Sequence, residues 1–136
     1  MNKIESVEAP KSVGAMVWTG RVITGLMGLA FLMSAVMKLT GGPDVAKQLE
    51  PMGLTVSMLL PLAILETVCV VIYLIPQTAV LGAILLTGYM GGAICTHWRV
   101  GEMFVPQILI GVLVWLGIYL REPKLRAILP IRRTRN

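Results

Sequence analysis

The stretch Thr67–Trp98, TVCVVIYLIPQTAVLGAILLTGYMGGAICTHW, runs for 32 residues without an aspartate, glutamate, lysine or arginine. A helix of about 20 residues crosses the hydrocarbon core of a bilayer, so this stretch and the apolar residues before it can hold two crossings. The turn between them is expected at Pro76-Gln77-Thr78, where proline breaks the helical pattern. We therefore predict a tight hairpin of two membrane spans, at residues 54–75 and 79–97.

Similar uncharged runs lie on both sides of this hairpin. Val22–Met37 precedes it and Met103–Leu120 follows it, which predicts further spans at residues 16–37 and 104–120. Between the first two spans, two glycines and Pro43 break the helix, and residues 44–50 can form two helical turns at the membrane interface. The predicted fold is all-α, a four-helix transmembrane bundle with a short interfacial helix between spans one and two.

The composition agrees with a membrane protein. Residues of the set AVILMFWYC make up 56% of the 136 residues, and charged residues only 14%. A water-soluble chain of this size needs far more polar surface, and two cysteines cannot form a disulfide framework. We divide the chain into an N-terminal tail at 1–15, a transmembrane domain at 16–120 and a basic tail at 121–136.

The net charge of +5 lies in the C-terminal tail, which holds six basic residues and Glu122, while the other 120 residues sum to zero. We interpret this as the basic mark of a cytoplasmic segment and not as a surface for RNA or DNA. Lysines and arginines number eight or nine on the side of both termini, against three on the other. We expect a multi-pass protein of the bacterial inner membrane, with both termini in the cytoplasm.

Two charged residues, Arg21 and Glu66, interrupt the apolar tracts. Glu66 is expected roughly 13 Å deep, where a lone carboxylate costs at least a few kcal/mol. One interpretation is structural: Glu66 forms a fixed ion pair, or is neutral and hydrogen-bonded, and sets the helix packing. The other is that Glu66 binds a ligand, a proton or an ion. Arg21 is its best candidate partner, at a depth that differs by roughly 6 Å; the alternative is that Arg21 turns towards the headgroups.

A second polar group is expected at the other ends of the spans, where Lys38, His97 and Arg99 lie. His97 is the only histidine and can change charge near neutral pH, although an interfacial histidine is more often structural. Cys69 and Cys95 lack a C-x-x-C motif and differ in depth, so we expect no disulfide and a buried packing role for both. The sequence holds no recognisable metal site, catalytic pair or cofactor motif.

Glycines recur within the predicted spans, where small residues let helices approach closely. They are Gly25, Gly28, Gly82, Gly88, Gly91, Gly92, Gly111 and Gly117. The run Gly88–Ala93 is the densest of these. We therefore expect the span at 79–97 to be the central helix, surrounded by the others.

Several local features follow one another in a characteristic order. They are Arg21, the span end Ser34–Leu39, the interfacial segment Leu49–Leu54, Glu66, the turn Leu74–Pro76, the run Leu81–Leu86 with the glycines after it, and His97. In this order they resemble the DoxX-like family of small four-span bacterial membrane proteins. The resemblance implies an integral membrane protein, and some relatives are associated with quinone-linked sulfur oxidation or other redox complexes. It implies Arg21, Lys38, Glu66 and His97 as the functional polar set.

Three functions fit these features. The leading hypothesis is an accessory component of a membrane redox system, with redox proteins or further copies of the chain as partners and a pocket near Glu66 for a small apolar or quinone-like molecule. The second is a small proton-coupled exporter that uses Glu66, although small multidrug transporters carry their glutamate in the first span, where this chain has Arg21. The third is a purely structural scaffold. We predict no catalytic residue and no cofactor other than a quinone.

Overall fold

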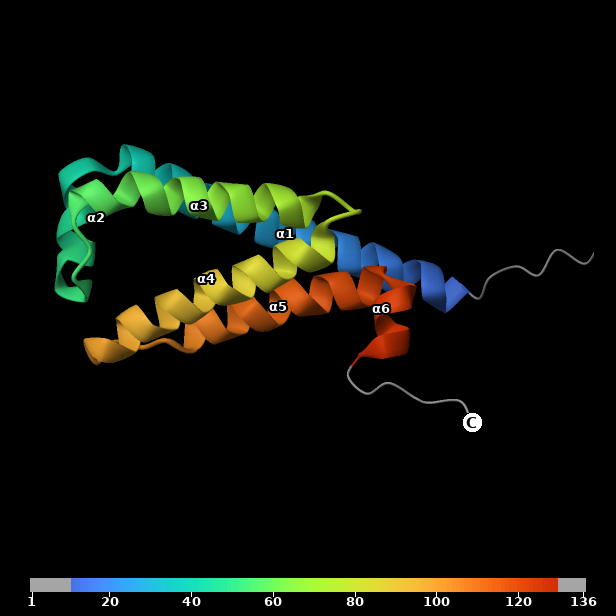
Figure 1. The fold of residues 1–136 in the computed structure, drawn as a ribbon. Helices are drawn as coiled ribbons and strands as arrows, with labels where there is room; N and C mark the ends of the chain where they lie inside the picture. The colour runs from blue at the N-terminus through green and yellow to red at the C-terminus, as the bar shows by residue number, and fades with distance from the viewer. Residues whose placement is uncertain (1–10, 130–136) are drawn as a thin grey trace, which may run out of the picture.

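The computed structural model describes residues 11–129, whose regular structure is helical throughout (Figure 1). Four long helices run side by side: α1 (Lys11–Thr40), α3 (Val56–Leu74), α4 (Ala79–Arg99) and α5 (Val105–Arg121). Short helices lie at their ends: α2 (Gly42–Leu49), the 3-10 helix η1 (Glu50–Met52) and α6 (Pro123–Ile128). The predicted all-α helical bundle is confirmed, and α2 lies where the interfacial helix was expected.

The helix bounds follow the predicted spans closely, except in α1. This helix continues through residues 11–15 and 38–40, beyond the expected span at 16–37, because neither the polar N-terminal segment nor Lys38 breaks it. The predicted basic tail also begins with helix, since α6 starts at Pro123 and Glu122 accepts a hydrogen bond from the Lys124 amide at 3.3 Å. Residues 1–10 and 130–136 of the two predicted tails lie outside the described residues.

Three of the long helices, α1, α3 and α4, are long and apolar enough to cross a membrane. The fourth, α5, has 17 residues and rises about 26 Å, which is at the lower end of the range for a transmembrane helix. A crossing by α5 therefore stays a prediction. The two described ends of the chain and the α3–α4 turn lie at one end of the bundle, and α2 and the α4–α5 loop at the other (Figure 1).

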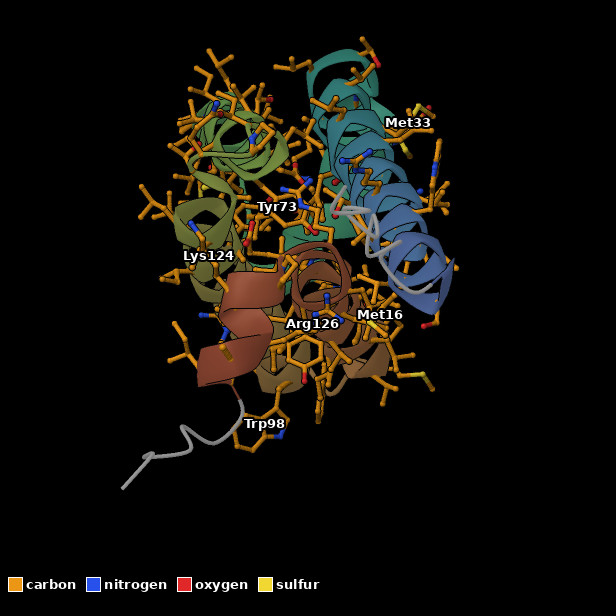
Figure 2. The ribbon with its side chains drawn as sticks, turned by 90° about the vertical axis from the view of Figure 1, so that its right-hand side faces the viewer. Met16, Met33, Tyr73, Trp98, Lys124 and Arg126 are labelled. Atoms are coloured by element: carbon orange, nitrogen blue, oxygen red, sulfur yellow. The ribbon has the colours of Figure 1, made fainter. Side chains whose placement is uncertain are left out.

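The long helices form a closed ring in which each packs against two others. Both α1 and α4 contact α3 on one side and α5 on the other. Val70, Leu86 and Val114 are completely or almost completely buried at the centre. Tyr73 crosses this core, where its hydroxyl donates a hydrogen bond to the Val114 carbonyl oxygen at 2.9 Å and so links α3 to α5 (Figure 2).

The outer faces of the ring are strongly apolar. Met33 and Leu29 on α1 are 57% and 59% exposed, and Trp98 at the end of α4 is 70% exposed. Figure 2 shows Met33 and Trp98 on the outside of the helices, whereas Tyr73 lies among them. Large exposed apolar surfaces are rare on monomeric soluble proteins, but a helix bundle in a bilayer presents them to lipid.

Only some of the predicted glycine contacts occur. Cβ atoms added at Gly28, Gly82 or Gly117 would meet Leu74, the Tyr73 backbone and Thr24, respectively. At five other positions, Gly25, Gly88, Gly91, Gly92 and Gly111, an added Cβ would meet nothing within 4 Å. The expectation of close packing there was wrong, and so was that of a central span at 79–97, because α4 packs against only two of the long helices.

Candidate functional site

The α3–α4 hairpin determines which polar residues meet inside the bundle. Gly82 of α4 lies against the backbone of Tyr73 in α3, so the two antiparallel helices touch at this level. Tyr89 lies seven residues after Gly82 on α4, and Glu66 lies seven residues before Tyr73 on α3. Both are therefore about 10 Å from this contact in the same direction, and Tyr89 faces Glu66. The Tyr89 side chain lies beside the Glu66 carboxylate, which is thereby placed on the inner side of the ring.

Lys38 of α1 completes this group. Its Nζ donates to Glu66 Oε2 at 2.7 Å, which forms a salt bridge, and to Ser34 Oγ at 2.6 Å, one turn earlier on α1. The Leu74 side chain packs against Gly28, which sets α1 and α3 at a level where Lys38 meets Glu66. We call Ser34, Lys38, Glu66 and Tyr89 the Glu66 cluster.

The Glu66 cluster lies in the middle of the bundle. Glu66 is about 15 Å from the start of α3 and about 12 Å from its end, and only 1% of it is exposed. A carboxylate at this depth is costly unless it is protonated or paired. The Lys38 ammonium supplies the opposite charge, and the aliphatic part of the lysine reaches inward from near the end of α1.

The predicted partner of Glu66 was wrong, because Glu66 pairs with Lys38 and not with Arg21. Arg21 lies seven residues before Gly28 on α1, whereas Glu66 lies eight residues before Leu74 on the antiparallel α3. The two residues are therefore separated by about 22 Å along the bundle, which no arginine side chain spans. Arg21 is instead an exposed residue at the end of the bundle that carries the α3–α4 turn.

His97 and Arg99 lie at the far end of α4, as expected, but they do not form a group with Lys38. The His97 Nδ1–H donates a hydrogen bond of 2.8 Å to the Ala93 carbonyl oxygen, and Nε2 lies 3.1 Å from Gln107 Nε2. Because the carbonyl oxygen only accepts, His97 carries its proton on Nδ1, and Nε2 accepts from the Gln107 amide. Arg99 donates to the Met52 carbonyl oxygen at 2.6 Å, which holds η1 against α4. These contacts tie the end of α4 to Gln107 of α5 and to η1.

The two cysteines are free, and only one is buried. Cys69 lies in the core one turn after Glu66, whereas Cys95 is exposed, contrary to the expectation that both would be packed inside. Among residues 11–129, no three histidine, cysteine or acidic side chains are grouped as metal ligands would be.

Reasoning from the sequence missed Ser34 and Tyr89. A usable signal existed for Tyr89, because a hairpin whose turn centres on Pro76 and Gln77 places residues 66 and 89 at nearly the same level. A tyrosine in an apolar helix also needs a partner for its hydroxyl. No comparable signal existed for Ser34, since the level of α1 relative to α3 follows from side-chain packing.

Comparison with known proteins identifies a family. A family described as the DoxX-like family matches residues 22–119, which include all of α3 and α4, most of α1 and α5, the Glu66 cluster and His97. No curated protein and no solved structure matches the chain. The matched range begins just after Arg21, so that arginine lies outside it.

Proposed function

Because this chain belongs to the DoxX-like family of membrane proteins, we propose that it is an accessory membrane component of a redox system and binds a small quinone-like molecule at the Glu66 cluster. The observation that carries this proposal is a group of hydrogen-bond donors held at mid-depth in an apolar bundle. A quinone dissolves in the same apolar layer and presents two carbonyl oxygens as acceptors. An apolar site with a few convergent polar groups is the usual form of a small-molecule site.

Lys38 provides the most direct anchor for such a ligand. An ammonium group has three N–H donors, and the Glu66 carboxylate and the Ser34 hydroxyl use two of them. No third acceptor for Nζ is found within residues 11–129, and the lysine side chain is 16% exposed, so one donor can face a ligand. The salt bridge to Glu66 holds the Lys38 ammonium directed inward. Tyr89 lies beside the same carboxylate.

The exporter hypothesis receives less support from this geometry. A glutamate that carries protons across a membrane must exchange them with water, but Glu66 is almost fully buried and salt-bridged to Lys38. The scaffold hypothesis accounts for the salt bridge but not for the donor that Lys38 retains. These observations favour ligand binding as the role of the Glu66 cluster.

Photolabelling with an azido-quinone tests the proposal directly. In the purified protein in mild detergent, we expect saturable labelling of peptides that contain Lys38, Cys69 or Tyr89. Lys38→Met should reduce this labelling by about tenfold, because it removes a charge-assisted hydrogen bond worth about 1.5–3 kcal/mol. Lys47→Met is the matched control, because Lys47 is exposed on α2 and the variant loses the same charge. It should not change the labelling.

Two results would overturn the proposal. One is labelling that an excess of unmodified quinone does not compete away, because such labelling reports partition into detergent. The other is saturable labelling that is equal in wild type and Lys38→Met. Extraction of the wild-type protein, followed by mass spectrometry of the lipophilic molecules that purify with it, shows which quinone occupies the site.

We also propose that the protein lies in the bacterial inner membrane with both termini in the cytoplasm. The described ends of the chain lie at the same end of the bundle, and that end carries Arg21, Arg121, Lys124 and Arg126 (Figure 1). Loops and ends rich in lysine and arginine stay on the cytoplasmic side.

Cysteine labelling checks this orientation. In a Cys95→Ser background, Glu102→Cys in the α4–α5 loop should react with a membrane-impermeant maleimide in intact spheroplasts. Lys124→Cys in α6 should react only after the membrane is permeabilised, because it lies at the opposite end. Both residues are exposed, so they are equally open to the reagent. The reverse pattern would place the termini outside.

A further inference from the structure

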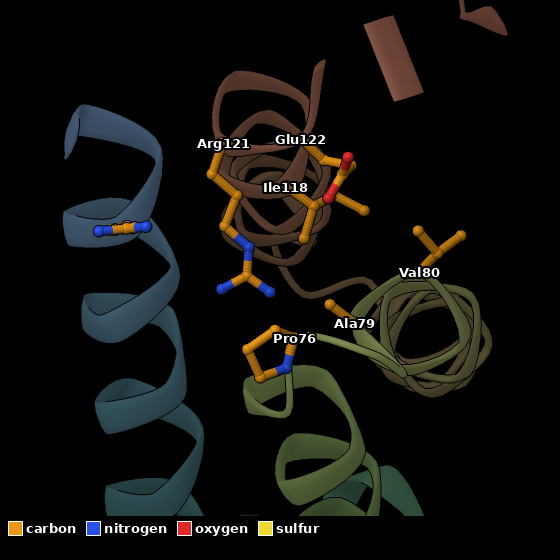
Figure 3. A pocket seen from close by; sticks show the side chains of 7 residues that line it. Pro76, Ala79, Val80, Ile118, Arg121 and Glu122 are labelled. Carbon is orange, nitrogen blue, oxygen red and sulfur yellow. The ribbon is translucent and has the colours of Figure 1, made fainter. Parts of the chain in front are cut away.

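A cavity of about 180 Å³ lies at the end of the bundle that carries the α3–α4 turn, away from the Glu66 cluster (Figure 3). Arg21 of α1, Pro76 of the turn, Ile118 of α5, and Arg121 and Glu122 at the end of α5 line it, together with the first residues of α4. One water takes up about 30 Å³ in the liquid, so the cavity has room for about six waters or one small polar group.

Arg21 of α1 and Arg121 of α5 both line this cavity because α1 and α5 approach closely at Gly20. Gly20 is buried, and a Cβ added there would come within 2.6 Å of the Arg121 backbone nitrogen, so α1 and α5 are in close contact. Arg21 follows Gly20 directly and therefore lies at the level of Arg121. Figure 3 shows the Arg121 guanidinium directed towards the turn at Pro76, between α1 and α4.

Arg121 is unsatisfied by the protein around it. Its Nη2 atom is buried and has no hydrogen-bond partner among residues 11–129. The one acidic residue that lines the cavity, Glu122, accepts a hydrogen bond from the Lys124 amide and caps α6. No arginine in the described part of the chain lies within 4 Å of a carboxylate oxygen, so neither Arg21 nor Arg121 is neutralised there.

The start of α4 adds to the positive potential of the cavity. Ala79 and Val80 are the first two residues of this 21-residue helix, and both line the cavity. The first amides of a helix have no acceptor within the helix, and its N-terminus carries a partial positive charge. Two arginines, one carboxylate and a helix N-terminus together leave a net positive charge at the cavity, which suits an anion.

We propose that this cavity binds a phosphate group, held by the guanidinium groups of Arg21 and Arg121 at the start of α4. Guanidinium groups bind phosphate oxygens through paired, charge-assisted hydrogen bonds, and such a group would supply the acceptor that Arg121 Nη2 lacks. Basic pockets between helices at the membrane surface bind anionic lipid headgroups, and a free phosphate has the same chemistry. Pro76, which lines the site, lies ten residues after Glu66, or some 15 Å, and the site does not depend on the function proposed for the Glu66 cluster.

Native mass spectrometry of the full chain in detergent tests this site. Phosphatidylglycerol, phosphatidylcholine and inorganic phosphate are titrated separately into the delipidated protein. We expect one tight phosphatidylglycerol per chain, bound at least about fivefold more strongly than phosphatidylcholine, because the net charge of the site favours an anionic headgroup. Competition by inorganic phosphate would show that the phosphate group itself is recognised. Binding of inorganic phosphate without tight lipid binding would identify free phosphate as the source.

Arg121→Gln should weaken the binding of the preferred ligand about tenfold or more, because it removes a charged donor pair. Lys124→Gln is the matched control: it removes the same charge at the same end of the bundle, from an exposed residue outside the cavity, and should change binding less than twofold. If Arg121→Gln does not fold, Arg21→Gln replaces it, because Arg21 is exposed and its loss should not prevent folding. Three results would overturn the proposal: equal binding in the arginine variant and the wild type, phosphatidylcholine binding as tightly as the preferred ligand, or an equal loss in Lys124→Gln.

Discussion

Lys38→Met should lower the melting temperature of the protein by about 10 °C, because it leaves the Glu66 carboxylate buried without its counter-ion. Removing one partner of a buried ion pair costs about 3–5 kcal/mol, and in a chain of this size each kcal/mol shifts the melting temperature by a few degrees. Glu66 is 1% exposed and must then take up a proton or draw water into the ring. Thermal melting in detergent measures the loss.

The reverse change, Glu66→Gln, should cost clearly less. Lys38 lies two residues before the end of α1, so its ammonium can turn towards the headgroups when Glu66 no longer attracts it. The double variant Lys38→Met, Glu66→Gln should recover part of the stability lost in Lys38→Met, because no unpaired charge remains inside. The coupling free energy between the two positions is expected to exceed about 1 kcal/mol.

Arg21→Gln serves as the control for this cycle. Arg21 and Glu66 lie about 22 Å apart along the bundle, so their substitutions should add within about 0.5 kcal/mol. Coupling of Glu66 to Arg21, with additivity between Lys38 and Glu66, would contradict the observed pairing.

The double variant Lys38→Met, Glu66→Gln also separates packing from binding. If this variant is stable but no longer binds the azido-quinone, a purely structural scaffold is ruled out.

The sequence predicted the helices better than their relative positions. Charge-free tracts and Pro76 placed α3, α4 and α5 within two residues of their observed bounds, because crossing a bilayer requires long uncharged segments. Helix α1 extends beyond the predicted first span at both ends, by five residues before it and three after it. Lysine is a good helix former, so Lys38 does not end the helix, which continues to Thr40.

The candidate site depended on information that local sequence patterns do not contain. Glu66 was identified from sequence because a charge within an apolar tract stands out by itself. Its partner could not be chosen between Arg21 and Lys38 by estimated depth, since the level of α1 against α3 is set by the contact of Gly28 with the Leu74 side chain. If α1 is placed a few helical turns too far along α3, Arg21 instead of Lys38 comes to the level of Glu66.

Gly82→Ala should be the most damaging of the small substitutions, with a loss of at least about 3 kcal/mol of stability. The new methyl group would overlap the backbone nitrogen and Cα of Tyr73, and backbone atoms cannot move aside as the end of a side chain can. The α3–α4 hairpin would have to open, and Tyr73 would lose the position from which its hydroxyl reaches Val114. Melting temperature and the yield of monodisperse protein in detergent both measure this effect.

Gly88→Ala provides the matched control on the same helix, because an added Cβ there meets nothing within 4 Å. It should be neutral or should stabilise the protein by up to about 1 kcal/mol, the usual gain in helix propensity from glycine to alanine. Gly28→Ala should fall between the two, since its Cβ would meet only the movable end of the Leu74 side chain. The order of stability is therefore expected to be Gly88→Ala, then Gly28→Ala, then Gly82→Ala. Equal losses at Gly82 and Gly88 would mean that α3 and α4 do not touch at Tyr73, and the register that brings Tyr89 to Glu66 would then be incorrect.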